Sequence, residues 1–239
     1  FDGILWAALA ETGLLGLALP EDVGGAGMGV LGLVALLESQ GAHVAPVPLA
    51  SSVAGALLPL ATSGATSLIE QWITPALNGS VLIVGGIDAA VDSARALQGR
   101  RDGDDWIVDG TLAAVPAGDR ADAALISFAT PDGERSALIA LDASGLTRES
   151  VAVTDRSAHG RLTFVGVRVR GTDTMPDGPA VAQHARTLQR IARAALASGV
   201  TAEAIRRTAA YTSERVQLDR PLSTNQAVAQ RAADAHLDA

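Results

Sequence analysis

The sequence contains no cysteine and no lysine, and only 3% of its residues are aromatic. The lack of cysteine excludes disulfides, thiol nucleophiles and thiolate metal sites, and it fits a reducing compartment such as the cytoplasm. All 18 basic residues are arginine, the net charge is −8, and no basic run is interleaved with aromatic residues. This composition argues against nucleic acid as a partner.

Long apolar runs and clustered metal ligands are also absent from the sequence. Glycine, serine, threonine and charged residues interrupt every apolar stretch before the roughly 18–20 residues that would span a bilayer. The four histidines, at positions 43, 159, 184 and 236, show no ligand spacing, so no metal site is predicted. With 239 residues, 48% of them hydrophobic, the chain can bury a substantial core. The absence of an initial methionine and the stop within a helical pattern at Ala239 suggest that both ends are cuts.

The order of sequence patterns predicts an α+β protein with three parts. Residues 1–77 carry helical spacing, with helices expected at 4–12, 30–40, 49–60 and 67–76. Residues 78–171 hold six short strand candidates, at 81–84, 96–101, 106–108, 123–128, 136–141 and 162–169. Turns separate these strands and no intervening helix is long enough to cross over, which predicts an antiparallel barrel or sandwich. Residues 172–239 return to helix, with a seam of mostly small residues typical of a bundle that begins here.

A glycine-rich turn, Pro20 to Gly29, lies between two of the predicted helices. A dinucleotide-binding loop is one interpretation of this turn, but the glycine spacing does not fit G-x-G-x-x-G, and a helix and turn precede it where a strand is required. A Rossmann site is therefore not expected.

The stretch from Tyr211 to Asp234 predicts a helix end, a turn and a second helix. Pro221 cannot extend a helix, so the first helix should stop near Leu218. Ser223 followed by Gln226 fits a capping box for the second helix. Arg215 at this corner offers a permanent charge and forked donors, which suit phosphate oxygens. The alternative is that Arg215 is a solvated helix-end cation and Gln226 only a cap.

Two segments resemble the acyl-CoA dehydrogenase family. One is the Trp…Leu-Ala-Glu-x-Gly-Leu…Pro-Glu-Asp-x-Gly-Gly-x-Gly run from Trp6 to Gly27; the other is Tyr…Arg-x-Gln-x-x-x-Pro-Leu…Gln…Ala-Asp within the 211–234 corner. The resemblance implies an FAD enzyme that desaturates acyl-CoA thioesters, with electron-transfer flavoprotein as electron acceptor. It also implies that the corner holds the diphosphate of a neighbouring subunit's FAD, through Arg215, Gln217, Leu218 and Gln226. Leu218 and Asp219 replace the family's Phe-Gly, and an acidic Asp219 beside a diphosphate needs an offset from Arg220 or Arg215.

The resemblance implies that the catalytic carboxylate usually lies well beyond the position that matches Ala239. Some members place it instead just before the Arg that matches Arg193, but this sequence has Ala192 there. No catalytic residue is therefore predicted within residues 1–239. Glu203 and Glu214 lie on the same helix, but each is expected to be a solvated or ion-paired side chain.

The segments that would meet the flavin ring also depart from the family. The family's Thr-Glu-Pro-x-x-Gly-Ser-Asp loop has no match in residues 85–93, and its Trp-Ile-Thr is replaced by Ala114-Val115-Pro116. Ala114 cannot stack on a ring, and Pro116 offers neither hydroxyl nor N–H.

The combination predicts a subunit that does not complete a flavin-ring site of its own but serves a neighbour's FAD. This division resembles the heteromeric (heterotetrameric) acyl-CoA dehydrogenases of bacterial steroid catabolism, in which a homologous partner chain supplies the base. The alternatives are a homotetrameric catalytic acyl-CoA dehydrogenase, a structural pseudo-subunit without FAD, and another flavin enzyme on the same fold, such as an oxidase.

Overall fold

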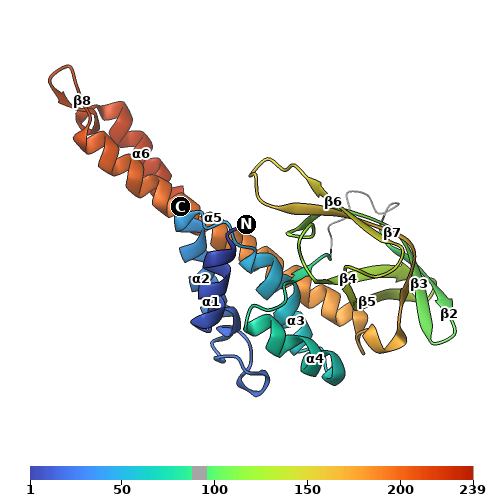
Figure 1. Cartoon of the computed structure of the whole chain (residues 1–239). Coiled ribbons are helices and arrows are strands. Elements are labelled where there is room, and N and C mark those ends of the chain that lie inside the picture. Colours follow the sequence, from blue (N-terminus) through green and yellow to red (C-terminus); the bar gives the residue numbers. More distant parts are fainter. Residues whose placement is uncertain (88–95, 239) are drawn as a thin grey trace. The chain divides into compact units, whose positions relative to one another are not determined.

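The structure is a computed structural model that describes residues 1–87 and 96–238 (Figure 1). It divides into two compact units. The first comprises residues 1–33 and 46–191, and the second comprises residues 34–45 and 192–239. The helices α2 (Gly29–His43) and α5 (Gly178–Glu214) each contribute residues to both units. The domain boundaries expected after residues 77 and 171 stay predictions.

The N-terminal part is helical, as the spacing of its apolar residues predicts. Its elements are α1 (Gly3–Glu11), the single turns η1 (Leu14–Gly16) and η2 (Glu21–Val23), α2, the π-helical segment η3 (Ala50–Leu57), α3 (Leu58–Ala61) and α4 (Thr66–Leu77). The Asp2 carboxylate begins α1, accepting hydrogen bonds from the N–H groups of Ile4 and Leu5 at 3.0 and 2.9 Å. Gly13, with a φ of 74°, follows the C-cap Thr12, so α1 ends within one residue of the predicted position.

In the described residues, the middle of the chain forms one curled sheet of seven strands. They are β1 (Ile83–Gly85), β2 (Gln98–Asp102), β3 (Asp105–Pro116), β4 (Ala123–Thr130), β5 (Gly133–Ala140), β6 (Leu146–Val151) and β7 (His159–Val169). The order is β1-β4-β2-β3-β7-β6, and β5 pairs with β4. Strand β4 provides part of the core, since residues 123–126 are all buried.

The sheet differs from the predicted one in direction and in number of strands. Most pairs are antiparallel, but β1 and β2 both pair with β4 in parallel, so the sheet is mixed. Strand β6 was missed because its burial pattern is almost wholly exposed, which leaves no apolar alternation to detect. Strand β3 continues to Pro116, well beyond the predicted 106–108, with a register shift between Leu112 and Val115.

The C-terminal part begins after the single turn η5 (Gly171–Asp173) and continues with α5, a two-strand hairpin of β8 (Val216–Gln217) and β9 (Arg220–Pro221), the turn η6 (Leu222–Thr224) and α6 (Gln226–Asp238). The first helix ends at Glu214 and not near Leu218, because the next residues pair as a hairpin. The predicted capping box is also wrong. Ser223 lies inside η6, and the Asn225 side chain accepts the Ala227 N–H at 3.1 Å, so Asn225 begins α6.

Close contact between α2 and α5 holds the second unit together. A Cβ on Gly199 would lie 2.0 Å from the Glu38 carbonyl oxygen, and one on Gly41 would lie 2.3 Å from that of Leu196. Ser198 donates a hydrogen bond to the Glu38 carboxylate at 3.3 Å. The absence of a side chain at Gly199 and Gly41 therefore allows the two helices to approach closely.

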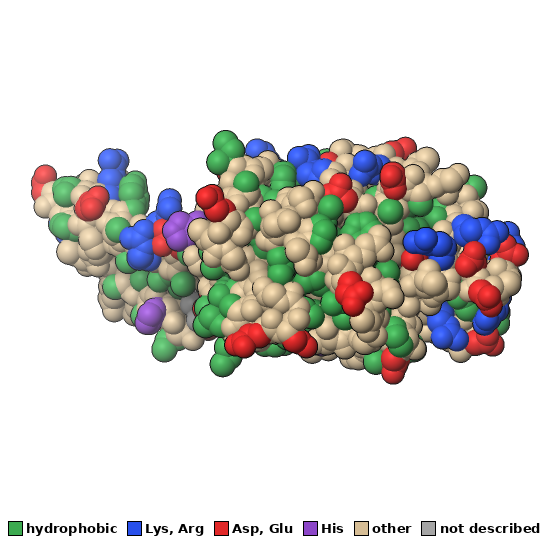
Figure 2. Space-filling view, turned by 60° about the horizontal axis from the view of Figure 1, so that its bottom comes forward, with side chains coloured by type: hydrophobic (Ala, Val, Ile, Leu, Met, Phe, Trp, Pro, Cys, Tyr) green, Lys and Arg blue, Asp and Glu red, His purple; other side chains and the backbone are tan. Residues whose placement is uncertain are grey.

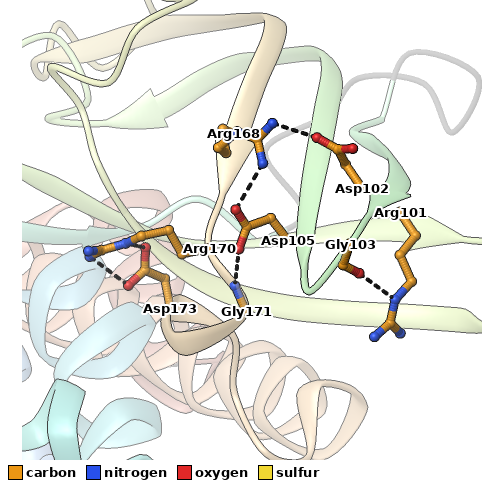
Figure 3. Close-up of polar contacts among 8 residues, drawn as sticks. All are labelled: Arg101, Asp102, Gly103, Asp105, Arg168, Arg170, Gly171 and Asp173. Carbon is orange, nitrogen blue, oxygen red and sulfur yellow. Dashed lines mark hydrogen bonds and ion pairs between the residues drawn. The ribbon is translucent and has the colours of Figure 1, made fainter.

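On the face seen in Figure 2, arginine and acidic side chains are interspersed and hydrophobic side chains are scattered between them. Several of the acidic groups are paired. Figure 3 shows a group of ion pairs at the turn between β2 and β3, where Arg168 on β7 bridges Asp102 and Asp105, the latter at 2.9 Å. Asp105 also accepts the Gly171 N–H at 3.1 Å, so the turn is tied to β7 and η5.

Candidate functional site

Three of the four predicted site residues, Arg215, Gln217 and Leu218, lie where α5 ends and the hairpin begins. Leu218 and Asp219 form the two-residue turn, with φ values of 53° and 61°. A type I′ hairpin turn requires such left-handed residues at both central positions, and glycine, asparagine or aspartate usually supplies them. The Leu218 side chain is 90% exposed. The hairpin therefore presents an apolar tip in a conformation that leucine adopts at a cost.

The backbone of Arg215 is held on both sides. Its N–H donates to the Tyr211 carbonyl at 2.9 Å, which closes the last turn of α5, and its carbonyl accepts from the Leu222 N–H at 2.9 Å. Gln217 lies in β8, paired with Arg220 of β9. Arg215, Gln217 and Leu218 are thus brought together in one short hairpin.

Gln226 is placed differently from the other three. It is the first residue of α6, and η6 and Asn225 separate it from β9. Within the described residues, no side-chain hydrogen bond joins Gln226 to the hairpin. The structure groups three of the four predicted residues and leaves the fourth at the start of the next helix.

The donor set of the hairpin suits a diphosphate. Guanidinium is a donor with permanent positive charge, and a glutamine amide can donate two further hydrogen bonds. Arg215 and Gln217 are both exposed, and no ion pair among the described residues joins Arg215 to a carboxylate. These groups fit the phosphate part of FAD.

The second candidate region is the one that a flavin ring would need. It is called the β3 edge here and lies where β1 ends at Gly85 and β3 ends at Pro116. The Ser51 hydroxyl of η3 accepts the Gly85 N–H at 3.3 Å and lies 3.5 Å from the Pro116 carbonyl oxygen. Gly85 also packs directly on η3, because a Cβ there would lie 2.6 Å from the Gly55 carbonyl oxygen. Ser51 therefore connects η3 with both strand ends, a link for which the sequence offered no signal.

Ala113, Ala114 and Pro116, at this edge, carry neither an aromatic ring nor a side-chain hydrogen-bond donor. Ala113 and Ala114 are half-buried methyl groups at the register shift of β3, and Pro116 has no N–H. The next backbone donor, the Ala117 N–H, is used by the Ala158 carbonyl at 2.7 Å. Of the neighbouring loop predicted to depart from the family, residues 88–93 lie outside the described residues.

Glu203, one of the two α5 carboxylates named above, is bound by two arginine side chains. Hydrogen bonds from Arg206 and Arg207, both at 2.7 Å, lower the pKa of Glu203 to about 2. A carboxylate with so low a pKa is a poor general base at neutral pH. The expected ion-paired role of Glu203 is confirmed. Ala192, at the position where some relatives place the base, is fully buried.

Neither a clustered set of metal ligands nor a membrane-spanning helix occurs in the part of the chain that the structure describes. Within residues 1–87 and 96–238, no group of three or more histidine or acidic side chains could hold a metal ion. No helix in the same residues combines the length and the apolar character needed to cross a membrane.

Comparison with known proteins gives two matches to family models. Residues 1–80 match the acyl-CoA dehydrogenase N-terminal domain, and residues 176–239 match the acyl-CoA dehydrogenase C-terminal domain. The hairpin lies inside the second match.

Individual relatives extend over the whole chain. Acyl-CoA dehydrogenase FadE27 of Mycobacterium tuberculosis is 34% identical over 238 residues, which is 100% of this chain and 63% of the relative. In the solved ChsE4-ChsE5 complex from the same organism, one chain is 34% identical with a TM-score of 0.95. The Tcur3481-Tcur3483 steroid ACAD, solved as a variant, is 38% identical with a TM-score of 0.90. This chain covers 65% of each of the two solved chains. The chain belongs to the acyl-CoA dehydrogenase family.

Proposed function

We propose that this chain is a subunit of an FAD-dependent acyl-CoA dehydrogenase that introduces a double bond between Cα and Cβ of an acyl-CoA thioester. FAD supplies the hydride acceptor for this reaction when it is bound. The solved steroid ACAD relative makes a steroid side-chain thioester the proposed substrate class. The chain shares its FAD with a homologous subunit, as in a heterotetramer, and the cytoplasm is the proposed location.

The observation that carries this proposal is the contrast between the two candidate regions. The hairpin presents Arg215 and Gln217 with their donors exposed, whereas the β3 edge presents Ala114 and Pro116, which can neither stack nor donate. A chain with such residues can hold the diphosphate of a neighbour's FAD without holding a flavin ring on its own sheet. In that arrangement the partner supplies the ring-binding face.

The partner also supplies the catalytic carboxylate in this proposal. The Cα proton passes to that carboxylate while the Cβ hydrogen leaves as hydride, so the acyl-CoA becomes the trans-2-enoyl-CoA. Glu203 does not take this part, because its two arginine partners keep it ionised and occupied. Electron-transfer flavoprotein is the proposed electron acceptor. Rapid reduction of O₂ by the assembled enzyme would instead favour an oxidase.

The test is co-expression of this chain with a homologous acyl-CoA dehydrogenase chain, followed by absorbance at the flavin bands and a count of FAD per chain. We expect one FAD for every two chains, and dehydrogenation only when both chains are present. One FAD per chain in a homotetramer of this chain, with activity, would overturn sharing. A colourless complex with the partner would overturn the FAD role altogether.

Substitution of Arg215 tests the hairpin directly. Arg215→Gln should weaken FAD retention in the assembled complex by roughly tenfold or more, because a charge-assisted hydrogen bond is lost. The matched control is Arg231→Gln, which removes the same charge from an exposed position on α6. Equal FAD content in both variants and the parent complex would contradict the diphosphate assignment.

A further inference from the structure

The pairing of the hairpin reaches one residue beyond its two short strands. Val216 pairs with Pro221 and Gln217 pairs with Arg220. The hydrogen bond from the Leu222 N–H to the Arg215 carbonyl, at 2.9 Å, continues the same antiparallel register. Arg215 therefore belongs to the ladder, opposite Leu222, although it also closes the last turn of α5.

This register decides which side chains share a face. Side chains alternate along a strand, and directly paired residues of an antiparallel ladder project to the same side. Arg215, Gln217 and Arg220 consequently lie on one face of the hairpin, while Val216 and Pro221 lie on the other. The first face carries two guanidinium groups with an amide directly opposite one of them.

The two guanidinium groups of this face form no ion pair within the described residues. No ion pair there joins Arg215 or Arg220 to a carboxylate, whereas Arg206 and Arg207, on the preceding helix, both bind Glu203. Asp219 stands between the two positions in sequence and forms no ion pair in the same residues. One Asp219 carboxylate among two guanidinium groups leaves a net positive hairpin in a chain whose net charge is −8.

From this arrangement we infer that Arg220 is a second phosphate-binding residue, which contacts the FAD diphosphate together with Arg215 and Gln217 and offsets the charge of Asp219. The inference rests on the proposed function, because it needs the hairpin to meet a diphosphate. It explains how a turn that carries Asp219 can face phosphate oxygens. Two forked donors on one face can each bind a phosphate group through parallel hydrogen bonds.

The test measures the dissociation constant of FAD for the assembled complex with its partner chain, by equilibrium dialysis with FAD fluorescence, at low salt and at 0.5 M salt. Arg220→Gln should weaken binding by roughly ten- to a hundredfold at low salt, and by less at high salt, because screening already weakens the charge interaction. Arg220→Lys keeps the charge but loses the forked donor geometry, so its dissociation constant for FAD should lie between those of the parent complex and Arg220→Gln. Asp219→Asn should tighten binding at low salt. Arg231→Gln, with the same charge change, should leave the constant unaltered.

The variants separate this inference from the proposed function. If Arg215→Gln weakens FAD binding while Arg220→Gln behaves like Arg231→Gln, the second phosphate contact is overturned and the diphosphate role of the hairpin stands. If neither Arg215→Gln nor Arg220→Gln changes FAD binding, the proposed function fails with the inference. Arg220 is exposed, so the variants should keep the circular dichroism spectrum of the parent complex.

Discussion

At the scale of single residues, Glu203 illustrates how neighbours decide what a carboxylate can do. Its pKa of about 2, caused by Arg206 and Arg207, lies well below the ordinary value of about 4.3 for a glutamate. A depressed folded-state pKa adds stability above the unfolded-state value, and this stability is lost as pH falls through the folded-state value. We expect Glu203→Gln to lower the thermal midpoint at pH 7, with a difference that shrinks between about pH 4.3 and pH 2.

The control for this prediction is Glu214→Gln. Glu214 lies on the same helix, is exposed, and forms no ion pair among the described residues. Thermal scans of both variants and the parent across this pH range would check the prediction. A difference for Glu203→Gln that stays constant from pH 7 to pH 2 would show that the two arginines do not bind the carboxylate in solution.

At the scale of elements, the ion pairs of Figure 3 connect a turn to two distant segments. The hydrogen bond from Arg168 is the largest influence lowering the pKa of Asp105, and the Gly171 N–H adds to it. Arg168→Ala should therefore lower the thermal midpoint by about 1–2 °C at neutral pH, less at high salt or below the pKa of Asp105. Arg161→Ala, which removes a single pair with Glu149 at 3.5 Å, is the control and should have a smaller effect. Equal shifts would mean that the bridge to two aspartates adds nothing.

The contact between α2 and α5 yields a second prediction at this scale. Alanine normally favours a helix over glycine by about 1 kcal/mol. At Gly199, however, the added methyl group would meet the Glu38 carbonyl oxygen at 2.0 Å, so the helices must separate. We expect Gly199→Ala to reduce the free energy of unfolding by about 1–3 kcal/mol.

Gly3→Ala is the matched substitution for Gly199→Ala. A Cβ at Gly3, in α1, meets only the Phe1 ring, at 3.7 Å, so this variant should be neutral or slightly stabilising. Denaturant unfolding of the two variants measures the difference. A Gly199→Ala variant as stable as Gly3→Ala would contradict the close helix contact.

At the scale of the whole molecule, burial is distributed very unevenly along the chain. No described residue from 200 to 238 is buried, whereas residues 123–126 of β4 all are. A helix without an apolar contact is only marginally stable in water. We expect rapid amide hydrogen exchange over 200–238 in the isolated chain and slow exchange over β4.

Assembly should change this exchange pattern. If the hairpin meets a neighbour's FAD, the partner chain and FAD together should slow exchange around 215–222 while β4 stays unchanged. Hydrogen exchange followed by mass spectrometry would measure both segments in one experiment. Slow exchange over 200–238 in the isolated chain would show that this segment is stable without a partner.

The sequence by itself determined the order of helical, strand-rich and helical parts, the start and stop of α1, and the ion-paired role of Glu203. Each of these depends on residues close together in the chain, where apolar spacing, caps and charge pairs act. The same holds for the grouping of Arg215, Gln217 and Leu218, which are neighbours in sequence.

Only the tertiary structure decided the features that join distant segments. The parallel pairing of β1 and β2 with β4, the exposed strand β6 and the link from Ser51 to Gly85 and Pro116 have no local signature. The left-handed turn at Leu218 and Asp219 was hidden as well, because leucine rarely adopts that conformation. The register of the β8–β9 hairpin places Arg220 on the same face as Arg215 and Gln217. Backbone pairing, and not sequence spacing, sets which side chains share a face.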